Sequence, residues 1–166
     1  MIKKRRRMEN KTDYKARLNL LNSGKNRIIF RKTARYIIGQ YVKSGEAKDY
    51  VILGLTSKEL LKYGWPQSLQ GSLKSIPASY LTGFLLGKKI LDKEEKPEVI
   101  FDIGLLRSIP KSRIYSFLKG VIDSGINLKH KEEMIPDENR IKGRHLKNSV
   151  PEIFNKIKEN IEKKFV

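Results

Sequence analysis

The chain has 166 residues, a length typical of one medium-sized folded core, and its 36 Lys and Arg against 18 Asp and Glu give a formal net charge of +18. The absence of cysteine excludes disulfides, thiolate metal sites and cysteine nucleophiles, and it is compatible with a reducing cytosol. A free protein with a pI of about 10.0 repels itself, which favours a polyanionic partner, above all nucleic acid.

The positive charge is concentrated at the N-terminus. Residues 1–43 hold fourteen Lys and Arg against Glu9 and Asp13, a net of +12 out of +18. Residues 1–12 show no apolar periodicity and are predicted to form a flexible basic arm, followed by no apolar segment of the kind found in secretory signals. No apolar stretch approaches the ~20 residues that span a bilayer, so no membrane partner is expected.

A short amphipathic helix is predicted over residues 13–22, with Tyr14, Leu18 and Leu21 at helical spacing and Gly24 as its stop. This helix is expected to deliver the chain to the core. Three β-rich runs then predict an antiparallel meander: Arg27 to Thr33, Tyr36 to Val42 and Tyr50 to Leu55.

The second half of the chain alternates helical and strand patterns. A helix over about 77–92 has too wide an apolar arc for a surface helix, and Gly83 and Gly87 would allow it to pack closely against a sheet. The apolar run 99–104 is typical of a central strand covered on both faces. With a further helix over about 112–124, this order predicts an α/β domain whose fourth strand returns parallel to a neighbour through a helical crossover.

The C-terminal region contains two different patterns. Residues 129–147 are polar and are expected to wrap over a surface. Residues 149–152, SVPE, form a capping-box pattern that begins an amphipathic helix containing Phe154, Ile157 and Ile161.

Basic residues of the first 17 positions are the first candidates for function. Each of them could neutralise a phosphate and release condensed counterions. The alternative is a solvated or localisation-like tail. The candidates are Lys3, Lys4, Arg5, Arg6, Arg7, Lys11, Lys15 and Arg17.

Three arginines of the first predicted strand form a second candidate group. Arg27, Arg31 and Arg35 are separated by even intervals, so an extended chain would place them on one face, where guanidinium groups could grip a phosphate backbone. The alternative is an ordinary solvent-facing side of the strand, or one that helices cover.

Four aromatic residues near basic groups, Tyr14, Tyr36, Tyr41 and Trp65, could stack on unpaired bases, although singly each also suits a core or rim position. Trp65 is the best candidate because it lies in a loop flanked by Gly64 and Pro66.

Residues suited to catalysis are sparse. His130 and His145 have no partner at metal-ligand spacing and are expected at the surface. Asp102 has no second carboxylate beside it, so a strand-end hydrogen bond is a better interpretation than a metal ligand. The sequence therefore predicts neither an enzyme nor a metal or cofactor site.

Several ordered blocks resemble a ribosomal protein family, the one numbered eighteen in the bacterial large subunit, in its archaeal form. The blocks include KTDYKARLNLLNSGKNRIIFRKTARYI (residues 11–37), PASYLTGFLLGKKIL (77–91), FDIGLLR (101–107), SRIYSFLKGVIDSGI (112–126) and PDENRIKGRHL (136–146). The resemblance covers roughly residues 5–146.

This resemblance implies a three-layer α/β/α sandwich with a mixed sheet and ribonuclease-H-like topology. It also implies a cytoplasmic constituent of the large ribosomal subunit that binds 5S rRNA in the central protuberance and contacts 23S rRNA and neighbouring ribosomal proteins. The division expected is a basic arm with a short helix (1–26), an α/β RNA-binding domain (27–147) and a C-terminal helix (148–166). The RNA contacts that the resemblance carries over are Lys3 to Arg7, Lys11, Tyr14, Lys15, Arg17, Arg27, Arg31, Lys32 and Arg35.

Two loops depart from the family pattern, residues 71–76 and Leu106, so RNA contacts there are not carried over. Two other functions stay open at this point. One is a general basic protein that binds any nucleic acid, and the other is a metal-dependent nuclease, since the implied topology also houses such enzymes.

Overall fold

The structure, a computed structural model, describes residues 5–9, 11–45, 48–146 and 150–165, except for the side chain of Arg7. Its centre is a four-stranded sheet in the order β3-β2-β1-β4. The strands are β1 (Asn26–Lys32), β2 (Ile37–Ser44), β3 (Asp49–Thr56) and β4 (Val99–Asp102). The first three strands pair antiparallel, which confirms the predicted meander.

The fourth strand, β4, pairs parallel with β1 after a helical crossover, as predicted. It lies at the edge of the sheet, however, so the prediction of a central strand covered on both faces is wrong. The apolar residues of this strand are explained instead by contacts on one of its faces. Phe101 stacks on Phe117 at 6.1 Å between ring centres on one face, while Asp102 lies on the other.

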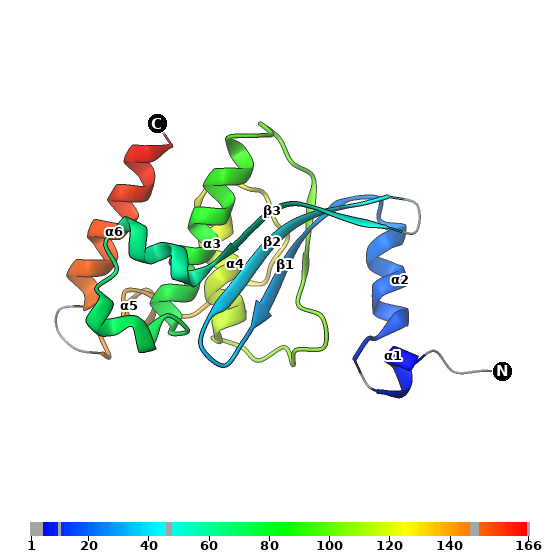
Figure 1. Cartoon of the computed structure of the whole chain (residues 1–166), viewed down its shortest axis with the longest axis horizontal. Helices are drawn as coiled ribbons and strands as arrows, with labels where there is room; N and C mark the ends of the chain where they lie inside the picture. Colours follow the sequence, from blue (N-terminus) through cyan, green and yellow to red (C-terminus); the bar gives the residue numbers. More distant parts are fainter. Residues whose placement is uncertain (1–4, 10, 46–47, 147–149, 166) are drawn as a thin grey trace.

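Two long helices, α3 (Ile76–Leu91) and α4 (Arg113–Asp123), cover one face of the sheet (Figure 1). Leu86 of α3 and Phe117 of α4 both approach Gly39 of β2, so the two helices share this face. The apolar side chains that alternate along the strands, such as Ile28 and Phe30, point into this contact and are fully buried.

Glycines set the distance between these two helices. A Cβ atom at Gly83 would lie 2.2 Å from the carbonyl oxygen of Phe117, and one at Gly120 would lie 2.1 Å from that of Tyr80. Gly87 likewise faces Ser124 of the α4 C-cap. The close packing predicted from Gly83 and Gly87 therefore occurs against α4 and not against the sheet, which α3 contacts through other residues such as Leu86.

The C-terminal helix α6 (Val150–Lys164) packs on the side of α3 that faces away from the sheet, where Phe154, Ile157 and Ile161 join the main core (Figure 1).

The predicted fold class, an α/β sandwich with a mixed sheet, is confirmed, and the arrangement is consistent with a three-layer fold. Ribonuclease-H-like topology stays a prediction. Ser149, the first residue of the predicted capping box, lies outside the described residues. The remaining short helices are η1 (Ser57–Tyr63), η2 (Gln67–Ser72), η3 (Glu132–Met134) and α5 (Glu138–Ile141).

The N-terminal helices α1 (Arg5–Met8) and α2 (Tyr14–Asn22) stand beside the sheet, near the start of β1 (Figure 1). The Asp13 side chain caps α2 by accepting hydrogen bonds from two backbone N–H groups of its first turn. The helix buries none of its side chains, and Leu18 is 57% exposed. The helix prediction is confirmed, and α2 leads the chain to β1 without entering the core itself.

Candidate nucleic-acid interface

Basic side chains cover the N-terminal helices. Arg5 and Lys11 flank Glu9 with ion pairs of 2.8 and 2.7 Å, and Arg6 donates to the Thr12 hydroxyl at 3.0 Å. All of these groups are at or near the surface, where water weakens an ion pair and its contribution to stability is small. A phosphate could therefore replace Glu9 as partner at little energetic cost. Of the other candidates, Lys3, Lys4 and the side chain of Arg7 lie outside the described part of the chain.

On α2, the three candidate side chains differ in their surroundings. Lys15 is exposed, and Tyr14 is half-buried. Arg17 reaches Asp49 at the start of β3, with 3.0 Å between Nη2 and Oδ2, and this ion pair connects α2 to the sheet.

Arg27 does not belong to an RNA-binding surface. It is 3% exposed, and its guanidinium lies 2.7 Å from Asp49 and 3.2 Å from Asp102, with a further hydrogen bond of 3.1 Å to Ser44. Its Nε atom is buried and has no hydrogen-bond partner among the described residues. The prediction that Arg27 grips phosphates is therefore wrong, because two carboxylates already occupy its charged group.

Arg31 shares the Asp102 carboxylate. Its Nη2 atom lies 3.1 Å from Oδ1 of Asp102, and its Nη1 atom donates to the Asp102 and Phe30 carbonyls. Asp102 also accepts the Gly104 N–H at 2.7 Å, which confirms the predicted strand-end hydrogen bond. The parallel register places Asp102 opposite Ile29, between the two arginines on the same face. The predicted row of free guanidinium groups is therefore interrupted.

Lys32 and Arg35 lie at the far end of β1 and in the turn that follows it. The turn is closed by a hydrogen bond of 2.9 Å from the Thr33 N–H to the Tyr36 carbonyl. Both basic side chains are exposed, and neither forms an ion pair with another described residue. They are therefore available to a phosphate, at the end of the sheet opposite to the N-terminal helices.

Trp65 is a core residue, so the prediction that it stacks on bases is wrong. It is 3% exposed, and its indole N–H donates to the Leu69 carbonyl at 3.1 Å. Gly64 ends η1 with φ +108°, a conformation that suits glycine, and this turn directs the tryptophan inward.

Tyr41 is also buried, and its hydroxyl donates to Glu94 and accepts from Asn26, both at 2.6 Å. Burial and the Glu94 carboxylate raise the pKa of Tyr41 to about 12. Tyr36 is half-buried against the core. Neither side chain presents an open stacking platform.

Asp49, the first residue of β3, forms ion pairs with Arg17 of α2 and with Arg27. Burial by itself acts to raise the pKa of this carboxyl, but the Arg27 and Arg17 guanidinium groups and the Ser44 hydroxyl outweigh it and hold the pKa below its ordinary value of 3.8. A carboxyl group whose pKa is lower in the folded than in the unfolded state stabilises the fold above its unfolded pKa. This contribution disappears as the pH falls through the folded pKa.

We therefore expect Asp49→Asn to lower the free energy of unfolding at pH 7 but to have a smaller effect as the pH falls below about 4. Urea unfolding of both proteins at pH 7 and pH 3 measures the difference. Glu98→Gln, which removes an exposed carboxylate paired with Lys25, serves as the control. An Asp49→Asn effect that is the same at both pH values would contradict the ion-pair role of Asp49.

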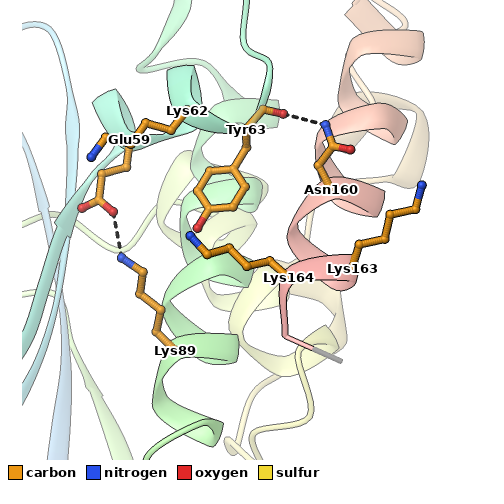
Figure 2. A pocket seen from close by; sticks show the side chains of 7 residues that line it. All are labelled: Glu59, Lys62, Tyr63, Lys89, Asn160, Lys163 and Lys164. Atoms are coloured by element: carbon orange, nitrogen blue, oxygen red, sulfur yellow. Dashed lines mark hydrogen bonds and ion pairs between the residues drawn. The ribbon is translucent and has the colours of Figure 1, made fainter.

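A polar pocket of about 450 Å³ lies between η1, α3 and α6 (Figure 2), lined by Glu59, Lys62, Tyr63, Lys89, Asn160, Lys163 and Lys164. The Lys89 amine lies 2.7 Å from the Glu59 carboxylate, and the Lys164 amine lies 5.3 Å from the centre of the Tyr63 ring. Figure 2 shows the Lys163 amine pointing away from these groups. Because the charges diverge and one is neutralised, the pocket lacks the convergence that a bound phosphate needs.

The described residues contain no group of three His, Cys, Asp or Glu side chains arranged to hold a metal ion. His130 and His145 are exposed, as predicted. Within the same described ranges, no helix combines the length and the apolar character required to cross a membrane.

Residues 1–99 match the family described as "Ribosomal large subunit proteins 60S L5, and 50S L18". Three archaeal proteins called "Large ribosomal subunit protein uL18" are similar over most of the chain. The Korarchaeum cryptofilum protein is 48% identical over 145 residues, which is 87% of this chain and 72% of the relative. The Methanothermobacter thermautotrophicus protein is 42% identical over 142 residues, 86% of this chain and 71% of the relative. The Methanoculleus marisnigri protein is 42% identical over 158 residues, 95% of this chain and 87% of the relative. This similarity accompanies a mixed sheet flanked by exposed basic side chains. It shows that the chain belongs to the uL18 family of large-subunit ribosomal proteins.

Proposed function

We propose that the chain is a structural constituent of the cytoplasmic large ribosomal subunit that binds 5S rRNA and helps attach it to 23S rRNA in the central protuberance, beside neighbouring ribosomal proteins. It carries out no chemical reaction. The observation that carries the proposal is the position of the N-terminal helices. Arg5 and Lys11 stand clear of the core and pair with Glu9, a surface carboxylate that a phosphate can replace.

Two features of Asp102 argue against a nuclease. Two guanidinium groups occupy its carboxylate and would compete with a metal ion. The other carboxylate in this ion-pair network is that of Asp49, and it also pairs with Arg27. The surroundings of Asp102 support a structural role in the sheet.

The arm can be tested by replacing four exposed basic residues, Arg5, Arg6, Lys11 and Lys15, with glutamine. Each neutralised phosphate contributes about 0.7–0.9 to the slope of log K against log salt, so removing four cationic side chains should flatten the slope for 5S rRNA by about 3. Filter binding at several salt concentrations measures this slope. A charge-matched control replaces four exposed lysines elsewhere, Lys93, Lys96, Lys129 and Lys131.

Equal loss of affinity in the control and the arm variant would show that net charge, not the arm, sets affinity. Competition between 5S rRNA and an equal mass of duplex DNA tests the alternative of a general basic binder. Preference for 5S rRNA supports the proposal, whereas equal competition favours the general binder.

A further inference from the structure

A groove of about 640 Å³ opens at the end of β1, between the first turns of α3 and α4 and the segment 140–146. Among the described residues, no carboxylate lines it, whereas six basic side chains do: Lys32, Arg107, Lys111, Arg113, Arg140 and His145. Its remaining surface is largely aliphatic, and Ile109 at its edge is 52% exposed. We call this cavity the basic groove.

The charges of the basic groove are almost uncompensated. Lys111 pairs with Asp137 at 3.1 Å, and both partners are exposed. The side chains of Lys32, Arg107, Arg113 and Arg140 form no ion pair or hydrogen bond with any other described residue. Like charges gathered in a concave site repel one another and raise the local concentration of anions, so the groove is suited to an anionic ligand.

The backbone at the groove adds to this preference. Ser112 is the N-cap residue of α4, a helix of 11 residues, but its side chain caps no backbone N–H, and its buried hydroxyl has no hydrogen-bond partner among the described residues. The first N–H groups of α4 therefore lack a side-chain acceptor and contribute partial positive charge. Lys111 precedes them with φ +55°, an unfavourable conformation held by its N–H bond of 2.8 Å to the Met134 carbonyl.

The groove is separate from the N-terminal helices. These helices stand near the start of β1 (Figure 1), whereas the groove lies at the end of that seven-residue strand. Seven residues of strand span roughly 23 Å, more than one phosphate can bridge. Arg27 and Arg31, which lie between the two positions, are occupied by Asp102. The two cationic surfaces are thus separate in space.

We propose that the basic groove binds backbone phosphates of RNA at a second site, independent of the N-terminal arm, with Arg107, Arg113 and Arg140 as the main contacts. This inference rests on the proposed function. Lys32 and Arg35 continue the positive charge from the groove to the β1–β2 turn, which suits an extended polyanion. The described lining contains no exposed aromatic ring on which a base could stack, so binding should depend on phosphates and not on base identity.

The test compares five full-length proteins: the wild type, the four-glutamine arm variant, a groove variant, the combination and a charge-matched control. The groove variant carries Arg107→Gln, Arg113→Gln and Arg140→Gln, and its charge-matched control carries Lys93→Gln, Lys96→Gln and Lys129→Gln. The probes are 5S rRNA and a 23S rRNA transcript. Thermal unfolding establishes that each variant is folded before its affinity is compared.

We expect the groove variant to reduce the salt sensitivity of binding to at least one of the two RNAs. Because three phosphates would no longer be neutralised, the fall in affinity between about 50 and 200 mM salt should shrink by roughly 20-fold or more. The combined variant should add this effect to that of the arm. If the arm variant responds but the groove variant matches its control for both RNAs, the groove proposal is overturned and the proposed function stands. If neither variant responds, both fall.

A crosslink identifies the occupant of the groove. A photoreactive amino acid at Ile109, incorporated in full-length protein within purified large subunits, should crosslink to RNA. Exclusive crosslinking to a protein would overturn the proposal in favour of an acidic partner segment. A photoreactive residue at Lys96, in the exposed turn before β4, controls for nonspecific crosslinking.

Discussion

Replacing Asp102 with alanine is expected to lower the free energy of unfolding by about 3–5 kcal/mol, because it leaves the buried Arg27 guanidinium with only part of its compensating charge. The change also removes one ion pair of Arg31 and the acceptor for the Gly104 N–H. For a protein of this length, such a loss corresponds to a fall in Tm of about 10 °C. Calorimetry or urea unfolding at pH 7 measures it.

The matched control is Glu98→Ala. Glu98 lies just before β4 and pairs with Lys25 at 3.3 Å, but its side chain is 78% exposed. Its removal should change stability by less than about 1 kcal/mol, because exposed ion pairs contribute little. If Asp102→Ala unfolds at the same urea concentration as Glu98→Ala, the Arg27–Asp102 contact does not stabilise the fold.

Replacing Gly120 with alanine should destabilise the protein by about 2–3 kcal/mol, although alanine is the better helix former by about 1 kcal/mol. The new Cβ atom would lie 2.1 Å from the Tyr80 carbonyl oxygen and 2.9 Å from the Phe84 nitrogen. Both are backbone atoms that no rotamer change can move away. The α3–α4 pair would have to separate, and its packing on the sheet would loosen.

Gly71→Ala is the control for this substitution. No heavy atom lies within 4 Å of a Cβ built at Gly71, and its φ is outside the left-handed region. This variant should be neutral or more stable by about 0.4–1 kcal/mol, since alanine restricts the unfolded chain. Comparable losses of stability in Gly120→Ala and Gly71→Ala would contradict the steric explanation. Thermal unfolding of the two variants side by side distinguishes these outcomes.

The buried ion pairs also explain how the chain separates folding from binding. Arg27 and Arg31 neutralise Asp49 and Asp102 within the sheet. The exposed basic residues are consequently divided between the N-terminal helices and the end of β1. A chain of net charge +18 thus uses part of its positive charge to hold the sheet together and leaves the rest at two separate surfaces.

Local sequence patterns predicted most of the elements. Runs rich in β-forming residues identified the three meander strands, and helical spacing identified α3, α4 and α6 close to their actual bounds. For α2, the pattern indicated a helix but not its surroundings. Leu18 and Leu21 have the spacing of a buried face, yet the helix is anchored by its Asp13 cap and by Arg17 without entering the core.

Whether Trp65 is buried or exposed depends on tertiary contacts that a local sequence pattern does not contain. A large ring in a Gly-Pro loop suits either a binding surface or a core, and only the fold supplies the cavity and the Leu69 carbonyl that accept it. The basic groove was missed for a related reason. Lys32, Arg107 and Arg140 are far apart in the sequence and meet only where the end of β1, the segment before α4 and α5 converge.

By itself, the sequence determined the elements of the α/β domain, the concentration of positive charge at the N-terminus and membership of a ribosomal protein family. These properties follow from residue types and their local spacing. Only the tertiary structure decided which arginines are free to bind a polyanion. The parallel pairing of β4 with β1 brings Asp102, 75 residues distant from Arg27, between Arg27 and Arg31. That contact exists only once the chain has folded, because it joins groups that no local pattern relates.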